Sequence, residues 1–203
     1  MLRSIVFDLD GTLIDSPLNF DLIRQALAIP EGEYILEYIE SLDESLRKEK
    51  HRLLEDIEVA AAKEAVLIEG AAEILHLAKK SGIPTAIFTR NCRAVTDIVL
   101  STFTLPVSQV ITRDDAKAKP DPEGLNMLLK SWKLKPLEML YVGDYRFDVE
   151  CGKKAGVRTA LFTAGKPVDD DYGADFVCST YAMLIRQLTA SRLLGPSENW
   201  CLG

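Results

Sequence analysis

Two carboxylates follow the first apolar run of the 203-residue chain. Asp8 and Asp10 come directly after residues 5–7, and only Leu9 separates them. In an extended chain, side chains two residues apart point to the same face, so both carboxylates point one way and Leu9 returns to the core. Like charges this close repel each other, and burial strengthens the repulsion. We therefore expect a cation between the two groups or a proton on one of them.

Further polar side chains follow later apolar runs. An isolated aspartate after a strand is more often a helix cap or a turn residue than a catalyst. In a parallel sheet, however, the carboxyl ends of the strands share one edge, where ligands bind. Several polar side chains at one edge of the sheet are better explained by a functional site than by chance. The side chains concerned are Thr89, Arg90, Asn91, Lys119, Asp144 and Asp148.

The chemistry of this set points to a metal and a phosphoryl group. Carboxylate oxygens without a nearby His or Cys suit a hard cation such as Mg²⁺. A lysine ammonium and a threonine hydroxyl suit the non-ester oxygens of a phosphoryl group. One carboxylate can act as a nucleophile that forms an aspartyl-phosphate, and another can act as general acid and base. Gly11 lets the backbone turn close to a ligand without a Cβ in the way.

Strands alternating with helices must position these residues. Short apolar or β-branched runs predict strands at residues 5–7, 84–89, 107–112, 138–143, 157–163 and 174–178. Apolar residues at helical spacing predict helices at residues 71–80, 94–102, 123–132 and 148–155. This alternation predicts an α/β fold, a doubly wound, Rossmann-like parallel sheet.

One segment breaks the alternation. Residues 17–66 contain no strand candidate and are rich in Leu, Glu, Lys and Ala at helical spacing. We expect them to form an all-helical cap inserted after the first strand. Residues 1–16 and 67–188 would then form the α/β catalytic core. The remaining residues, 189–203, carry Gly, Pro and Ser and are expected to form a flexible tail.

Four motifs of the chain resemble those of the haloacid dehalogenase superfamily of phosphohydrolases. They are "DLDGT" at residues 8–12, Thr89, Lys119 and "GDYRFD" at residues 143–148. The resemblance covers nearly the whole chain in order and at suitable spacing. The helical insertion after the first motif resembles the small cap of the phosphoglycolate phosphatase-like subgroup. "KPDP" at residues 119–122 and the helix after it fit that subgroup as well.

The resemblance implies a role for each motif residue. Asp8 would attack phosphorus, and Asp10 would protonate the leaving oxygen, activate the hydrolytic water and offer its backbone carbonyl to Mg²⁺. Asp144 would bind Mg²⁺ directly, and Asp148 would bind it through water or orient the lysine. The phosphoryl oxygens would be held by Thr89, Arg90, Asn91 and Lys119. The implied metal ligands are thus Asp8, Asp10, Asp144 and Asp148. The implied activity is Mg²⁺-dependent hydrolysis of a small phosphomonoester such as 2-phosphoglycolate.

Two alternative functions stay open at this point. One is a phosphoryl-transferring sugar-phosphate mutase, although such mutases usually have a β-branched apolar residue where Thr12 stands. The other is a receiver-like regulatory protein that is phosphorylated on aspartate but does not turn over. In receiver domains, however, the acceptor follows a later strand and no helical cap interrupts the chain. Asp10 counts against dehalogenase chemistry, because the dehalogenases lack the second aspartate.

Composition narrows the class of partner. With 31 acidic and 24 basic residues, the formal net charge of −7 argues against a nucleic-acid binder. No apolar stretch is long enough to span a bilayer, and the charges of Asp8 and Asp10 interrupt the only apolar run near the N-terminus. The four cysteines have neither disulfide-framework nor zinc spacing. We expect a cytoplasmic monomer or homodimer that acts on a small-molecule phosphate ester.

Overall fold

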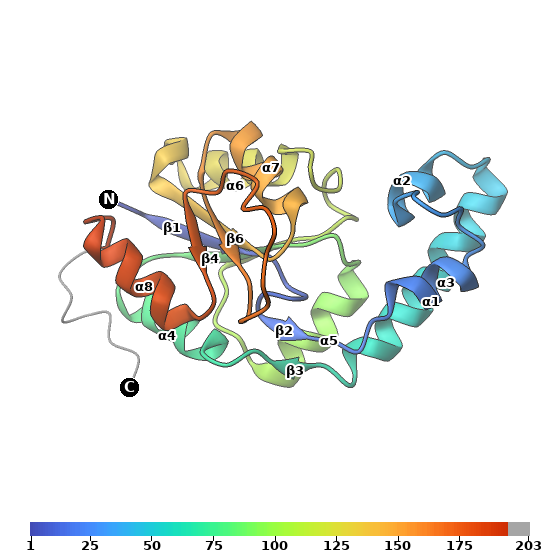
Figure 1. Ribbon diagram of the computed structural model, residues 1–203, viewed down its shortest axis with the longest axis horizontal. Helices are drawn as coiled ribbons and strands as arrows, with labels where there is room; N and C mark the ends of the chain where they lie inside the picture. The colour runs from blue at the N-terminus through green and yellow to red at the C-terminus, as the bar shows by residue number, and fades with distance from the viewer. Residues whose placement is uncertain (195–203) are drawn as a thin grey trace.

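The computed structural model describes residues 1–194, and its centre is a parallel sheet of six strands (Figure 1). The strand order is β5-β4-β1-β6-β7-β8. The strand bounds are β1 Ser4–Phe7, β4 Thr85–Phe88, β5 Gln109–Ile111, β6 Met139–Gly143, β7 Arg158–Phe162 and β8 Phe176–Cys178. β1 pairs with β4 on one side and with β6 on the other, which places the end of β1 in the middle of the sheet. The predicted α/β parallel fold is confirmed.

Helices cover both faces of the sheet. Successive side chains of a strand point to opposite faces, so the side chains of β1 pack alternately against the helices of one face and of the other. Ile5 and Phe7 belong to the apolar cluster that also contains side chains of α4, α5 and α8. Val6 belongs to the cluster of α6 and α7 on the opposite face. The helix bounds are α4 Ala71–Lys80, α5 Arg93–Phe103, α6 Glu123–Trp132, α7 Arg146–Ala155 and α8 Tyr181–Ala190, and a 3-10 helix, η1 Pro136–Glu138, precedes β6.

The segment between β1 and α4 forms three helices, α1 Phe20–Ala26, α2 Ile35–Glu40 and α3 Glu44–Ala62, which stand to one side of the sheet in Figure 1. They enclose a small apolar cluster of their own, made of Ile23, Leu27, Ile29, Leu36, Ile39 and Leu54. Phe20 and Leu22, in contrast, are exposed. We call this three-helix segment the insertion.

A two-stranded antiparallel sheet lies where the chain enters and leaves the insertion. β2 Ile14–Asp15 pairs with β3 Val66–Leu67, with Ile14 opposite Leu67 and Asp15 opposite Val66. Neither strand is predicted from the sequence, where Val66 falls within the expected helical segment. Two residues are too few to show an alternating apolar pattern, so these strands leave no signal in the sequence.

The end of the described chain packs against the core. α8 continues to Ala190, and both Leu193 and Leu194 are buried in the main apolar cluster. The Leu2 amide also donates to the Leu193 carbonyl at 2.7 Å. Residues 189–194 of the predicted tail therefore pack against the core, because α8 continues to Ala190 and the two leucines after it bury their side chains. Residues 195–203 of that predicted tail lie outside the described residues.

Candidate active site

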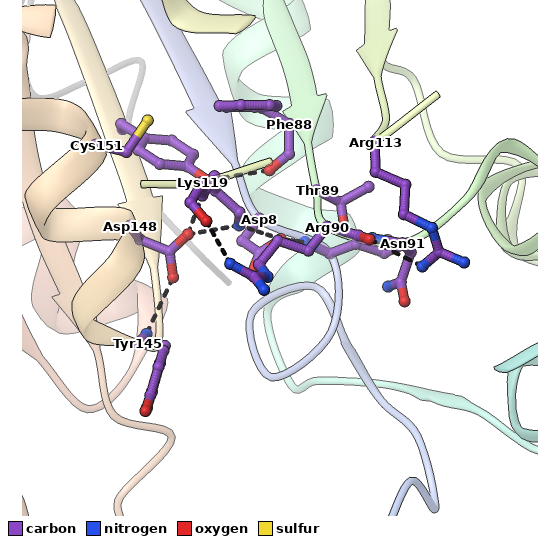
Figure 2. Close-up of polar contacts among 12 residues, drawn as sticks. Asp8, Phe88, Thr89, Arg90, Asn91, Arg113, Lys119, Tyr145, Asp148 and Cys151 are labelled. Atoms are coloured by element: carbon purple, nitrogen blue, oxygen red, sulfur yellow. Dashed lines mark hydrogen bonds and ion pairs between the residues drawn. The ribbon is translucent and has the colours of Figure 1, made fainter. Parts of the chain in front are cut away.

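A buried lysine bridges two of the predicted carboxylates. The Nζ atom of Lys119 lies 2.8 Å from Oδ1 of Asp8 and 2.5 Å from Oδ1 of Asp148 (Figure 2). Only 1% of Lys119 is exposed. Burial by itself lowers the pKa of Lys119, but the charges of Asp148 and Asp8 outweigh it, and the net pKa is raised. The ammonium therefore stays charged and balances part of the negative charge at the strand ends.

Asp8 stands at the end of β1, where its amide donates to the Val142 carbonyl of β6 at 2.8 Å. Its Oδ1 atom accepts a second hydrogen bond from the Leu9 amide at 2.7 Å, in addition to the contact with Lys119. Burial raises the pKa of Asp8 to about 6, against the lowering influence of Lys119. Within the described residues both partners engage Oδ1, so Oδ2 is the oxygen available for attack.

Asp148 is fixed by three donors on neighbouring elements. Besides Lys119, the Tyr141 hydroxyl donates to its Oδ1 at 2.8 Å, and the Tyr145 amide donates to its Oδ2 at 3.0 Å. This second bond belongs to a capping box at the start of α7, which therefore begins at Arg146, two residues earlier than the sequence predicts. The Asp148 carboxylate thus contacts Lys119 directly, and the orienting role predicted for it stays a prediction.

The carboxylates of Asp8, Asp144 and Asp148 converge. Each offers one oxygen, and the three oxygens lie within 4.8 Å of one another. Burial, together with the negative charges of Asp148 and Asp8, raises the pKa of Asp144 well above its ordinary value, although one side of this carboxylate is open to solvent. Such a cluster of hard oxygen donors fits a divalent cation of the Mg²⁺ type, which would relieve the repulsion.

Gly11 makes this convergence possible. Its φ of +77° lies in the left-handed region, and a Cβ on it would overlap the Asp144 carboxylate. The glycine of the "DLDGT" motif is therefore required both for the turn and for the approach of Asp144.

The Asp10 carboxylate lies apart from this cluster and faces the start of the insertion. The Ser16 hydroxyl donates to its Oδ2 at 2.6 Å, and the Ser16 amide donates to its Oδ1 at 3.2 Å. Burial raises the pKa of Asp10, and the Ser16 bonds only partly offset this. Proton transfer by the Asp10 side chain and metal binding by its backbone carbonyl both stay predictions.

The predicted phosphate loop follows β4. Thr89 is buried, and its Oγ1 atom accepts a hydrogen bond from the Asn91 amide at 3.1 Å. The Arg90 side chain, in contrast, reaches toward the insertion, where its Nη1 and Nη2 atoms donate to Oε1 and Oε2 of Glu37 at 2.9 and 2.8 Å. Arg90 Nη1 also donates to the Lys119 carbonyl (Figure 2).

A second pair of charges joins the insertion to this loop. Arg113 Nη1 donates to Oε1 of Glu58, a buried residue of α3, at 2.8 Å, and to the Arg90 carbonyl at 3.0 Å. Burial raises the pKa of Glu58, and Arg113 only partly offsets this. Nothing in the sequence singles out Glu37, Glu58 or Arg113, because charged residues on helices and loops are usually solvated.

Aromatic and cationic side chains gather around Phe147 at the start of α7. Tyr34 of the insertion and Tyr145 both pack edge-on against Phe147, at ring-centroid distances of 4.9 and 5.2 Å. Arg90 and Arg146 stack on the same phenylalanine at 4.7 and 5.1 Å. These contacts hold the insertion against the N-terminal turn of α7, the helix that also carries Asp148.

Comparison with known proteins identifies related chains. Residues 5–162 match the family described as haloacid dehalogenase-like hydrolase. An uncharacterized hydrolase of Saccharomyces cerevisiae is 33% identical over 168 residues, which cover 79% of this chain and 77% of that protein. The N-acetylmuramic acid 6-phosphate phosphatase of Pseudomonas putida is 30% identical over 227 residues, which cover 96% and 99%. A hydrolase from Pseudomonas syringae has the same fold, with a TM-score of 0.76 at 20% identity over 93% of this chain and 98% of that chain.

Proposed function

The chain belongs to the haloacid dehalogenase-like hydrolase family, and we propose that it is a Mg²⁺-dependent phosphatase that hydrolyses a small cytosolic phosphomonoester through an aspartyl-phosphate. One observation carries the proposal: the buried Lys119 ammonium contacts both Asp8 and Asp148 beside the Asp144 carboxylate. A fixed cation next to a nucleophilic carboxylate and a cluster of hard oxygen donors is the arrangement that phosphoryl transfer requires.

The first half-reaction uses Asp8 and Asp10. Oδ2 of Asp8 forms a bond to phosphorus while the bond between phosphorus and the ester oxygen breaks. Asp10, whose pKa is raised by burial, gives its proton to the leaving oxygen. Lys119 and the hydroxyl of Thr89 hold the non-ester oxygens during the transfer.

The second half-reaction returns the enzyme to its starting state. The Asp10 carboxylate takes a proton from a water molecule, and the water oxygen attacks phosphorus. The bond between phosphorus and Asp8 then breaks, which releases inorganic phosphate and restores the Asp8 carboxylate. Asp8, Asp144 and Asp148, with the backbone carbonyl of Asp10, would hold the Mg²⁺. When bound, this ion neutralises charge on the phosphoryl group.

We further propose that the insertion, predicted from the sequence as residues 17–66, acts as the cap that selects the leaving group. Tyr34 of the insertion packs against Phe147 of α7, and Glu37 ties the insertion to Arg90 in the predicted phosphate loop. In this proposal Tyr34 and Phe147 contact the leaving group of a bound ester, and the Glu37–Arg90 pair holds the insertion beside the phosphate loop. The substrate class is a small phosphate ester of the size of 2-phosphoglycolate or a phosphorylated amino sugar.

The test is phosphate release from a panel of small esters with and without Mg²⁺. The panel contains 2-phosphoglycolate, N-acetylmuramic acid 6-phosphate and p-nitrophenyl phosphate, and the control protein is Asp8→Asn. We expect one ester to be hydrolysed far better than the others, only with metal and only by wild type. Isomerised product without net phosphate release would instead indicate a mutase. Stable labelling of Asp8 by acetyl phosphate without turnover would indicate a regulatory protein.

A further inference from the structure

The two charge pairs between the insertion and the core converge on one residue of the predicted phosphate loop. The Arg90 side chain binds Glu37 of α2, and the Arg90 carbonyl accepts from Arg113, which binds Glu58 of α3. Arg90 is therefore held at its guanidinium and at its backbone by partners that each depend on a carboxylate of the insertion. Its immediate neighbours along the chain are Thr89 and Asn91.

The same guanidinium also reaches the loop of the buried lysine. Arg90 Nη1 donates both to the Lys119 carbonyl and to Oε1 of Glu37. The Arg90 Cζ atom also lies over the Phe147 ring, 4.7 Å from its centroid, and this contact restricts the guanidinium further. An unbroken series of contacts thus runs from a carboxylate of the insertion to the backbone of the lysine that holds Asp8.

We propose that Glu37 is a positioning residue for phosphoryl transfer, which through Arg90 fixes the backbone of Lys119 and of the Thr89–Asn91 loop in the geometry that grips the phosphoryl group. Glu37 itself does not contact the reacting atoms in this account. The inference rests on the proposed phosphatase function, and it assigns to one cap residue a role in the transfer step rather than in leaving-group selection.

The solvent exposure of the Glu37 and Arg90 side chains distinguishes a positioning role from a role in global stability. The side chains of Glu37 and Arg90 are 43% and 22% exposed, so their attraction is screened by solvent and adds little to global stability. The bidentate geometry still restricts where the guanidinium can lie, and catalysis is sensitive to small displacements of groups that bind the transferring atom. Loss of Glu37 should therefore alter turnover much more than folding.

A neighbouring glutamate offers a matched control. Glu40 lies on the same helix, one turn further on, and pairs within the insertion with His51 at 2.7 Å and Arg47 at 3.8 Å. Glu37→Gln and Glu40→Gln remove the same charge from the same helix, but only the first replaces the bidentate, charge-assisted contact with Arg90 by at most one neutral hydrogen bond. Both proteins should unfold at the same temperature as wild type.

The test measures kcat and KM of wild type, Glu37→Gln and Glu40→Gln on the three esters named above, together with inhibition by orthovanadate. Vanadate is an analogue of the phosphoryl group in the transition state of its transfer, and its inhibition constant does not depend on the fraction of active protein. For Glu37→Gln we expect kcat to fall about tenfold on every ester, KM to change less than about twofold, and vanadate inhibition to weaken in parallel. Glu40→Gln should match wild type.

Three results would overturn the proposal. A loss confined to one ester would make Glu37 a contact of the leaving group, since the phosphoryl group is common to all three. Unchanged kinetics would remove Glu37 from the transfer step. A tenfold loss that persists when Glu37→Gln is added to Arg90→Met would show that Glu37 does not act through Arg90. If wild type releases no phosphate from any ester, the proposed function itself fails, and this inference fails with it.

Discussion

The hydroxyl of Tyr141 allows a quantitative test of how Asp148 is held. Tyr141 is 1% exposed, and its hydroxyl lies 2.8 Å from Oδ1 of Asp148 and 3.0 Å from the Phe88 carbonyl. Tyr141→Phe removes only this oxygen, so the ring continues to fill its space and no large cavity forms. A hydrogen bond to a charged group contributes about 1.5–3 kcal/mol, so we expect the free energy of unfolding to fall by about 2 kcal/mol.

A second buried tyrosine gives the control. Tyr181 is also 1% exposed, and its hydroxyl donates to the uncharged Thr12 carbonyl at 2.7 Å. Tyr181→Phe should therefore cost less, about 1 kcal/mol. In a chain of this size the Tyr141→Phe loss corresponds to a fall of the melting temperature by about 4–8 °C.

Urea unfolding followed by circular dichroism measures both losses, and the slope against urea should be the same for all three proteins. The reasoning is refuted if Tyr141→Phe lies within about 0.5 kcal/mol of wild type, or if it costs no more than Tyr181→Phe. In the first case the hydroxyl adds nothing to the positioning of Asp148. In the second the charge of the acceptor has no measurable effect.

Three further outcomes follow from the geometry. Gly11→Ala should cost about 1–2 kcal/mol in urea unfolding, because of its left-handed φ. It should also raise the Mg²⁺ concentration needed for half-maximal activity, because its Cβ overlaps Asp144. An unchanged Mg²⁺ titration would contradict this. Burial raises the pKa of Cys151 to about 12, so at about pH 8 its thiolate is about three orders of magnitude rarer than that of an ordinary thiol. Iodoacetamide should therefore label it, as read by peptide mass spectrometry, only after unfolding; equally fast labelling of the native protein would refute the argument. Arg113→Met should destabilise the fold by about 3–5 kcal/mol by leaving Glu58 buried without its cation, and adding Glu58→Gln should recover part of the loss. Burial raises the folded-state pKa of Glu58, so its neutral form contributes stability that is lost as the pH rises through that value; the destabilisation should be larger at about pH 8 than at about pH 5, and the reverse order in urea unfolding would contradict the sign.

Elements with a clear period were predictable from the sequence. The helices at Ala71–Lys80 and Glu123–Trp132 have the predicted bounds, and all six strands of the main sheet lie within or overlap their predicted runs. α8 was not predicted, although Leu184, Ile185 and Leu188 stand at helical spacing and are buried. This spacing was a usable signal near the end of residues 67–188, which the sequence assigns to the α/β core without a helix at this point.

The site was predictable to the extent that its residues follow strands. The sequence places Asp8, Lys119, Asp144 and Asp148 at strand ends, and the fold brings all four together. The residues that hydrogen-bond to these four side chains were not predictable, because their types and positions do not distinguish them from ordinary core or surface residues. Tyr141 lies in an apolar strand and looks like an ordinary core residue until the fold sets its hydroxyl beside a carboxylate 7 positions away.

The antiparallel pair β2–β3 has a consequence for how the two parts of the chain can change independently. Because Ile14 lies opposite Leu67, the chain leaves the core and returns to it within one strand spacing, about 5 Å. For the stability of the core, the insertion therefore counts as a single closed loop. The entropic free-energy cost of closing such a loop rises by only about 0.6 kcal/mol for each doubling of its length. Replacing residues 17–65 by a turn of about six residues is about three doublings, a gain of only about 2 kcal/mol. As far as loop entropy is concerned, helices can thus be lengthened or exchanged at this point at little cost to the sheet. The two ion pairs made by Glu37 and Glu58, and the packing of Ala62 in the main core, are what such an exchange would have to re-create.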